Sequence, residues 1–290
     1  MPVDTLNRAA LTYHDHKNHF MIQLTKKCAI FLLILVPFFS KAQQQPAPAG
    51  ASAQELADKL SNPVASMISV PFQNNSDWGI GPNNGSKNTL NFQPVIPFKL
   101  TGNLNLITRY IIPIVAQRDI TGPNTQQFGL SDATASAWFT SAHPKNGFIW
   151  GVGPALLIPI ATNDYLGTKK FGVGPTALAL KQGHGNTFGF LLNQLWSVAG
   201  DKNRQDVSQL FVQPFFSHSF SSGASLGGNM EFTQNWQANT TLLFLNPVIS
   251  GITKIGKQPI QMAIGPRIPL AGPEGLRPAF GIRSVVIFVF

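Results

Sequence analysis

Apolar and polar positions alternate with a period of two along most of the chain, in segments of about 11 to 15 residues separated by Gly, Pro, Asn and Asp. This period is typical of β-strands that have one polar and one apolar face. It predicts twelve strands, at residues 66–78, 88–100, 104–118, 128–142, 148–162, 172–182, 187–199, 207–220, 224–237, 240–254, 259–271 and 279–290. No amphipathic helical pattern of comparable length interrupts them, so the pattern predicts an all-β fold.

The last predicted strand shows the alternation most clearly, and the chain ends there on an aromatic residue. One face carries Phe280, Ile282, Val286, Phe288 and Phe290, and the other carries Gly281 and Arg283. In a membrane β-barrel the apolar face meets lipid and the polar face lines a wet interior, whereas a soluble sandwich buries its apolar face. The period alone is compatible with both architectures.

The connections between the strands alternate in length. Short turns are predicted at residues 101–103, 143–147, 183–186, 221–223 and 255–258, and longer loops at 79–87, 119–127, 163–170, 200–206 and 272–278. This alternation and an even strand number are typical of bacterial outer-membrane barrels with both termini in the periplasm. The connection Ala238–Asn239 is the exception. Residues 66–290 are therefore predicted to form a transmembrane antiparallel up-and-down β-barrel of about 12 strands.

Many prolines fall inside the predicted strands, where each removes a donor from the hydrogen-bond ladder. They include Pro94, Pro97, Pro113, Pro154, Pro159, Pro175, Pro214, Pro247, Pro266 and Pro269. We expect many of them near strand ends or at β-bulges that curve the wall, often beside glycine, as in Gly153-Pro154 and Gly174-Pro175. A phosphate-binding loop is disfavoured, because no strand-to-helix transition and no Lys-Ser/Thr pair accompanies these glycines.

The first 65 residues do not share the strand pattern. Residues 21–42 have the layout of a secretory signal peptide, and their apolar run is shorter than the roughly 20 residues of a spanning helix. Residues 1–20 are interpreted as a wrongly assigned start or a disordered segment, with a metal-binding tract at His14, His16 and His19 as the alternative. Residues 43–65 are predicted to be a flexible lead and a short helix that begins at a capping box. This helix is either a clamp at the periplasmic rim or a plug in the lumen.

Charge and cysteine content restrict the classes of function. The chain has a formal net charge of +9, which falls to about +6 when residues 1–42 are removed with five basic and two acidic side chains. The remaining Lys and Arg are scattered, which disfavours a nucleic-acid partner and favours weak attraction to anionic solutes or lipid headgroups. The single cysteine, Cys28, lies in the predicted signal peptide, so no disulfide, zinc site or thiol nucleophile is expected. We also expect no other metal and no cofactor.

Several motifs resemble those of a family of Gram-negative outer-membrane proteins. These are residues 62–73, 92–97, 149–154, 194–200, 213–215 and 254–259. Members of this family are labelled as transporters or, wrongly, as neuromedin U, and they are loosely similar to outer-membrane barrels linked to phenol degradation. The resemblance covers nearly all of residues 55–290. It implies a porin-like barrel in the cell outer membrane, but it supplies no catalytic or binding residues.

Alternation places a set of polar side chains inside the barrel. They are Lys99, Asn105, Arg109, Asp132, Thr134, Asn229, Glu231, Lys254, Arg267 and Arg283, of which Arg109, Asp132, Asn229, Glu231, Arg267 and Arg283 are the candidates for a lumen constriction. Charges persist in a narrow barrel where they pair or meet water, so Glu231 and Asp132 are expected to pair with Arg267, Arg283 or Arg109. Either a salt-bridge network fills the barrel, or a constriction selects solutes.

The outer wall carries three further groups of candidates. Phe280, Phe288 and Phe290 are the predicted signal for the outer-membrane assembly machinery, and Trp138, Trp150, Trp196 and Trp236 are expected in aromatic girdles. An outer-membrane phospholipase uses Ser and His on its outer wall, and the candidates here are Ser217, His218 and Ser219. Adjacent strand residues face opposite sides, and no Asn or Asp is expected beside them to orient the histidine, so an enzyme is not expected.

The sequence therefore favours a passive channel or transporter for small solutes, surrounded by membrane lipid and lipopolysaccharide. A structural or adhesion-type barrel with a blocked lumen is the second hypothesis. A lipid-modifying outer-membrane enzyme is the third. A conducting lumen would distinguish the first hypothesis from the second.

Overall fold

The alternating segments form antiparallel β-strands in a computed structural model that describes residues 52–63, 67–256 and 258–290. The strands are β1 (Ser69–Ile80), β2 (Gly85–Phe92), β3 (Val95–Lys99), β4 (Leu104–Arg118), β5 (Gln126–Leu130), β6 (Ala133–Ser141), β7 (Phe148–Ile158), β8 (Lys170–Gly183), β9 (Asn186–Gly200), β10 (Ser208–Ser219), β11 (Ala224–Asn235), β12 (Thr240–Ile255), β13 (Gln258–Ala271) and β14 (Phe280–Val289). One helix, α2 (Ala53–Leu60), precedes them in the described part of the chain. The predicted signal peptide and residues 1–20 lie outside the described residues.

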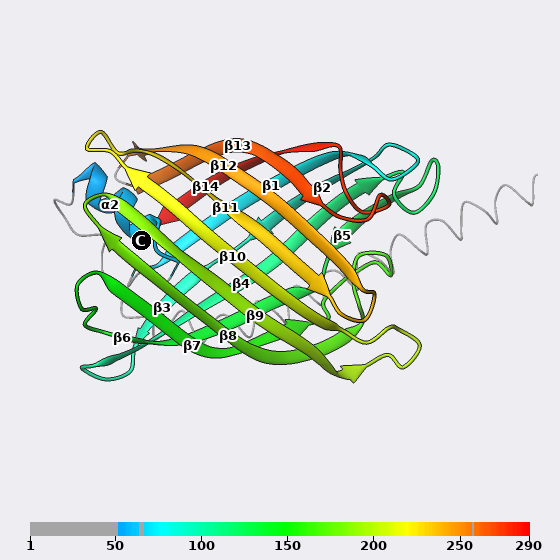
Figure 1. Cartoon of the computed structure of the whole chain (residues 1–290), viewed down its shortest axis with the longest axis horizontal. Coiled ribbons are helices and arrows are strands. Elements are labelled where there is room, and N and C mark those ends of the chain that lie inside the picture. Colours follow the sequence, from blue (N-terminus) through cyan, green and yellow to red (C-terminus); the bar gives the residue numbers. More distant parts are fainter. Residues whose placement is uncertain (1–51, 64–66, 257) are drawn as a thin grey trace, which may run out of the picture. The chain divides into compact units, whose positions relative to one another are not determined.

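These strands close into a barrel with twelve positions around its wall (Figure 1). β2 and β3 share one position, since both pair with β4, and β5 and β6 share another for the same reason. β14 pairs with β1 from Ser69↔Val289 to Trp78↔Phe280, which closes the sheet. Closure satisfies the backbone groups that an edge strand would leave unpaired in lipid. The predicted all-β, twelve-stranded barrel with a short helix is confirmed.

The connections distinguish the two ends of the barrel. Helix α2 and the C-terminus lie at the same end (Figure 1), which also carries the two-residue connection between β8 and β9. We call this end periplasmic and the other end outer, following the polarity of bacterial barrels. At the outer end, residues 159–169 and 201–207 form longer loops, whereas residues 236–239 form a tight turn there. The exception predicted at Ala238–Asn239 is therefore present.

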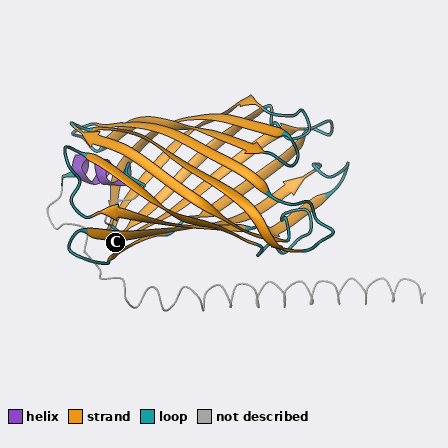
Figure 2. Cartoon of the chain, turned by 60° about the horizontal axis from the view of Figure 1, so that its bottom comes forward, coloured by secondary structure: helices purple, strands orange, loops and turns teal. Residues whose placement is uncertain are grey.

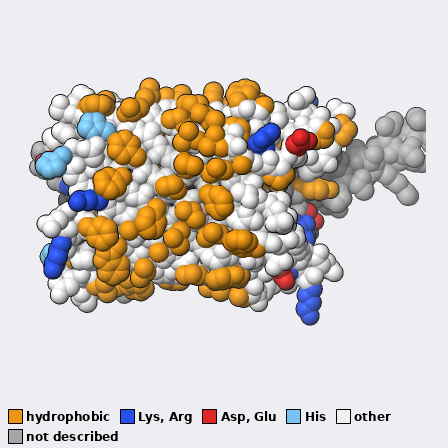
Figure 3. Space-filling model, viewed as in Figure 1, with side chains coloured by type: hydrophobic (Ala, Val, Ile, Leu, Met, Phe, Trp, Pro, Cys, Tyr) orange, Lys and Arg blue, Asp and Glu red, His pale blue; other side chains and the backbone are white. Residues whose placement is uncertain are grey.

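Large apolar side chains cover the outside of the wall. Figure 3 shows an apolar band around the visible face, with charged side chains towards its two ends. Trp150, Trp196 and Trp236 are exposed, as expected of girdle residues. Trp138 contradicts that expectation, because it is completely buried on the inner face. No helix among the described residues is long and apolar enough to cross a bilayer. The apolar exterior is what a closed barrel needs in order to sit in lipid.

The Gly-Pro pairs within the wall adopt a different structure from the one predicted. Pairing of β8 with β9 stops after Val173↔Trp196 and resumes at Thr176↔Asn193 with the register unchanged, so Pro175 lies in a gap in the ladder. A Cβ atom on Gly174 would collide with the carbonyl oxygen of Gln194. Pro175 therefore needs no bulge. Its missing N–H leaves a gap in the ladder, and Gly174 beside it allows the backbones of β8 and β9 to approach closely there. Pro94 separates β2 from β3, as a strand-end proline was expected to do.

Candidate functional site

A network of charged side chains lines the inner wall from β11 to β1. Glu231 on β11 accepts from Arg267 Nη1 on β13 at 2.8 Å, and its other carboxylate oxygen lies 2.8 Å from Arg283 Nη2 on β14. Arg267 Nε also lies 3.2 Å from Asp77 Oδ1 on β1. Alternation explains this grouping, since all four residues occupy inward positions on their strands. The predicted pairing of Glu231 with Arg267 and Arg283 is confirmed.

Amide side chains complete the network. Asn75 accepts from Arg283 Nε at 2.8 Å, and Asn229 accepts from Arg283 Nη1 at 3.3 Å. Asn246 donates to Asn229 at 2.9 Å and accepts from Arg267 Nη1 at 3.2 Å. Arg267 also lies over the ring of Phe244, 3.6 Å from its centroid. These partners hold both guanidinium groups at fixed positions on the wall, and Arg283 is only 2% exposed as a result.

The opposite side of the lumen is apolar. Its buried cluster consists of Val95, Ile107, Trp138, Leu178, Leu180 and Leu191, with Ile149, Phe211 and Phe215 packed against it. Trp138 Nε1 donates to Thr176 Oγ1 at 3.2 Å, which satisfies the indole inside this cluster. The lumen therefore has a charged network on one side and a mainly apolar cluster on the other.

Arg109 lies on the apolar side, with its guanidinium 5.5 Å from the centroid of the Trp138 ring. It occupies β4, on the wall opposite Glu231 of β11. Its buried Nε has no hydrogen-bond partner in the described structure. A cavity of about 90 Å³ lies beside Arg109 and is also lined by Lys59 and Leu60 at the end of α2. Arg109 thus faces both the lumen and the helix.

Helix α2 forms because Ser52 and Glu55 make a capping box, as predicted. One face of the helix is buried: Leu56 packs with Met67 and with Val289 near the C-terminus. The helix is also held to the strands by polar contacts, since Gln54 donates to the carbonyl of Ser219 at 3.1 Å and Ser61 donates to Ser217 at 3.2 Å. Figure 2 shows the helix at one end of the barrel. It therefore lies in the periplasmic mouth, fixed to inward positions of the wall.

Asp132 does not join the charged network. It accepts from the backbone N–H and the hydroxyl of Thr168, both at 2.6 Å, and thereby anchors the loop between β7 and β8. The expected pairing of Asp132 with an arginine is therefore wrong. Asp132 sits at the break between β5 and β6, where its carboxylate meets the outer loop instead of the lumen arginines. Asp77 takes the role of second carboxylate that was assigned to Asp132.

The sequence reasoning missed Asp77, Asn75 and Asn246 as members of the network. Asp77 and Asn75 occupy inward-facing positions of β1, where they pair with Gly281 and Arg283 of β14. Strand alternation alone could therefore have placed both side chains in the lumen. Asn246 occupies the inward phase of β12 opposite Asn229. Alternation gives the face of a residue but not its height in the barrel. Selecting these three residues required the register of neighbouring strands.

The serine and histidine candidates for an enzyme are separated by the wall. His218 shares the outward phase of β10 with the exposed Phe216, whereas Ser217 and Ser219 point inward, and Ser217 contacts Ser61 of the helix. His218 Nδ1 lies 2.9 Å from Asn186 Oδ1, so the expectation that no Asn would stand beside the histidine is wrong. No serine is hydrogen-bonded to the His218 ring in the described structure. The described residues also contain no group of three or more His, Cys, Asp and Glu that could hold a metal ion.

Comparison with solved structures places this fold among outer-membrane barrels. An outer-membrane channel from Pseudomonas putida F1 superposes with a TM-score of 0.61 at 16% sequence identity, covering 85% of this chain and 100% of that chain. The β-domain of the Bordetella autotransporter BrkA gives 0.44 at 7% identity, covering 78% and 100% of the two chains. A Pseudomonas aeruginosa FadL homologue gives 0.34 at 9% identity, covering 86% and 96%.

No protein-family model matches the sequence, and no curated protein matches it. The likeness to the P. putida channel is one of fold, since the sequence identity is low. The closed wall and the apolar exterior independently fit a lipid environment. Together with the shared fold, they give the protein the architecture of an outer-membrane β-barrel.

Proposed function

We propose that the protein is a passive channel for small solutes, with a lumen narrowed by the charged network and by helix α2. The observation that carries this proposal is the set of charged and amide side chains inside a closed wall. Such groups are costly in a dry interior and are typical of a barrel that holds water. The P. putida protein of the same fold is described as an outer-membrane channel, which supports the same role here.

The charges in the lumen favour weak anion selectivity. Two carboxylates, Asp77 and Glu231, face four cationic side chains in the narrowed region: Arg109, Arg267, Arg283 and Lys87, which pairs with Asp77 across β1 and β2. This leaves an excess of two positive charges. Fixed charges in a narrow path act on passing ions because solvent screens them poorly. Mixed signs keep the preference small. The substrate class that follows is small polar solutes, with anions passing somewhat faster than cations.

A structural barrel with a blocked lumen is the second candidate. The observation that favours it is helix α2, which is held in the periplasmic mouth by apolar packing and by hydrogen bonds to β10. If the helix and the charged network together close the path, the charges serve only to hold the wall in shape.

Planar-bilayer recording on the refolded mature protein tests the two candidates. A channel gives discrete current steps, and its reversal potential under a potassium chloride gradient shows weak anion preference. A blocked barrel gives no steps, although its migration on a gel still changes on heating as expected of a folded barrel. Protein kept unfolded in urea serves as the control for leak through damaged bilayers. Absence of steps from correctly folded protein would contradict the channel.

A further inference from the structure

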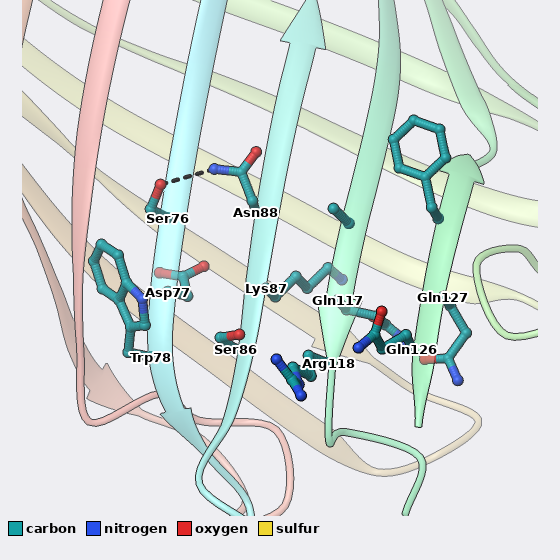
Figure 4. A pocket seen from close by; sticks show the side chains of 12 residues that line it. Ser76, Asp77, Trp78, Ser86, Lys87, Asn88, Gln117, Arg118, Gln126 and Gln127 are labelled. Carbon is teal, nitrogen blue, oxygen red and sulfur yellow. Dashed lines mark hydrogen bonds between the residues drawn. The ribbon is translucent and has the colours of Figure 1, made fainter. Parts of the chain in front are cut away.

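A shallow groove of about 450 Å³ crosses the outer wall near the outer ends of β1, β2, β4 and β5 (Figure 4). Two rows of side chains border it, and in each row the residues pair with one another across neighbouring strands. The row nearer the outer end consists of Trp78, Ser86, Arg118 and Gln126. The other row consists of Ser76, Asn88, Ala116 and Phe128. The residues between the rows face the lumen: Asp77, Gln117 and Gln127 are buried, and Lys87 is half-buried. The groove exists because several side chains in the rows are small, so the backbone forms its floor.

The polarity of this groove is unusual for a lipid-facing wall. Another hollow in the wall, lined by Leu226, Ile249 and Met262, is apolar. Here Asn88 donates to Ser76 at 2.8 Å, but Ser86 and Gln126 make no side-chain hydrogen bond within the described residues. Hydroxyl and carboxamide groups that face hydrocarbon without partners are costly. The groove therefore fits a polar occupant better than an acyl chain.

Arg118 adds a positive charge to the row nearer the outer end. Its side chain is 63% exposed, and its only ion pair in the described structure is a long one, 3.5 Å from Nε to Asp119 Oδ2. The terminal nitrogens of the guanidinium group are thus available at the groove. A guanidinium group presents paired donors that match the oxygens of a phosphate group. An anionic, phosphate-bearing group is the ligand that suits this position.

Aromatic side chains mark the depth of the groove in the membrane. Trp78 stacks on Phe280, with ring centroids 5.0 Å apart, and Phe128 is exposed at the other end of the groove. Aromatic side chains of this kind gather where the hydrocarbon meets the headgroups. The groove thus lies at the level of the outer-leaflet headgroups, with aromatic surfaces at both ends.

We propose that this groove binds the phosphorylated sugar headgroup of an outer-leaflet glycolipid. Arg118 holds the phosphate group, and Ser86, Asn88 and Gln126 bond to sugar hydroxyls. Trp78 and Phe128 pack against the apolar parts of the same lipid. The site lies on the outside of the wall, so the proposal does not depend on whether the lumen conducts.

Binding of purified lipopolysaccharide to the refolded mature protein in detergent micelles, measured by native mass spectrometry, tests the proposal. We expect Arg118→Glu to weaken binding roughly tenfold or more, because a charge-assisted bond is replaced by repulsion. We expect Ser86→Leu to weaken it as well, by filling the groove. Arg277→Glu, which makes the same charge change in an exposed outer loop, is the matched control and should bind like wild type.

A second measurement uses only the wild-type protein, so it does not depend on how the variants fold. Lipopolysaccharide should be retained better than its dephosphorylated form and better than phosphatidylglycerol, which has a phosphate but no phosphorylated sugar. Equal retention of all three lipids would overturn the proposal. It would also be overturned if wild type and Arg118→Glu bound lipopolysaccharide equally. A homodimer that Ser86→Leu dissociates, without any change in lipid binding, would assign the groove to a second copy of the chain and refute a lipid site.

Discussion

Glu231 is the residue on which the charged network depends most, because Arg267 and Arg283 share its carboxylate. Arg267 has a second carboxylate partner in Asp77, whereas the other close partners of Arg283 are the neutral amides of Asn75 and Asn229. Loss of Glu231 would therefore leave Arg283 with no carboxylate among these close partners. Breaking a buried ion pair typically costs about 3–5 kcal/mol, because the remaining charge stays buried without its partner.

Replacement of single lumen charges should shift ion selectivity if the barrel conducts. We expect Glu231→Gln to raise anion preference and Arg267→Gln to lower it, because each removes one fixed charge from a poorly screened path. Reversal potentials under a salt gradient measure both shifts. Arg277→Gln, in an exposed outer loop, is the control that should leave selectivity unchanged. Open channels that ignore both lumen substitutions would show that these residues do not line the conducting path.

Acid should release the loop between β9 and β10. Hydrogen bonds from Lys170 Nζ at 2.8 Å and Ser197 Oγ at 3.1 Å, together with the charge of Lys170, hold the pKa of Asp206 below its usual value. Because the pKa of Asp206 is lower in the folded loop than its unfolded value of about 3.9, its carboxylate stabilises the folded loop at pH values above that unfolded value. This stabilisation is lost as the pH falls through the folded pKa. The anisotropy of a fluorophore at Asn203→Cys should therefore fall below about pH 4. The same fall in a Lys170→Met variant would contradict this origin.

At the scale of elements, helix α2 is the part whose position bears most directly on transport. Its capping box was readable in the sequence, but its contacts with β10 and β14 were not, because they join segments far apart along the chain. Such contacts decide between the rim clamp and the lumen plug. The observed burial of Leu56 against Val289 places the helix in the mouth of the barrel.

A cross-link between α2 and β10 should hold the channel in a low-conducting state. The hydroxyl oxygens of Ser61 and Ser217 are 3.2 Å apart, so these two positions are candidates for an engineered disulfide. We expect a small current after oxidation of the double variant and a larger one after reduction, because the helix can then leave the mouth. The Ser61→Cys single variant is the control without a cross-link. An equal current in both redox states would mean that α2 does not obstruct the path.

Strand β14 should be the element that controls assembly. Phe280 on its outer face and Phe290, which follows it, are exposed, and its pairing with β1 closes the wall. We expect deletion of Phe290 or Phe290→Asp to prevent membrane insertion with little effect on secretion, because the aromatic signal and the closing strand share this segment. Heat-dependent gel migration reports folding, with Phe290→Tyr as the conservative control. Normal migration and yield of the Asp variant would reject the prediction.

At the scale of the whole molecule, the barrel encloses a charged side and an apolar side within one lumen. The polar exterior groove is a third surface, and it faces the membrane. Successive residues of a strand point to opposite faces of the wall. One short segment such as residues 76–78 therefore contributes both to the groove and to the charged network. A substitution in this segment can therefore affect lipid contact and the lumen together.

The mature protein is predicted to begin at Gln43, outside the described residues. Ser40 and Ala42 place small residues at the two positions that signal peptidase reads. Mass spectrometry of protein from the outer-membrane fraction should give the mass of residues 43–290, and Ala42→Arg should prevent cleavage at this bond. Detection of residues 1–20 in the mature protein would contradict the prediction.

The sequence by itself determined the strand segments, the faces of most lumen residues and the capped helix. These features depend on local chemistry: a period of two residues, turn residues at segment ends, and Ser52 with Glu55 at a helix start. Only the tertiary structure decided which inward residues meet. Asp132 and Asp77 look equivalent in the sequence, yet one anchors a loop and the other pairs with Arg267. The reason is physical, because the height of a side chain in a barrel depends on the stagger between strands, which residues far apart in the chain set together.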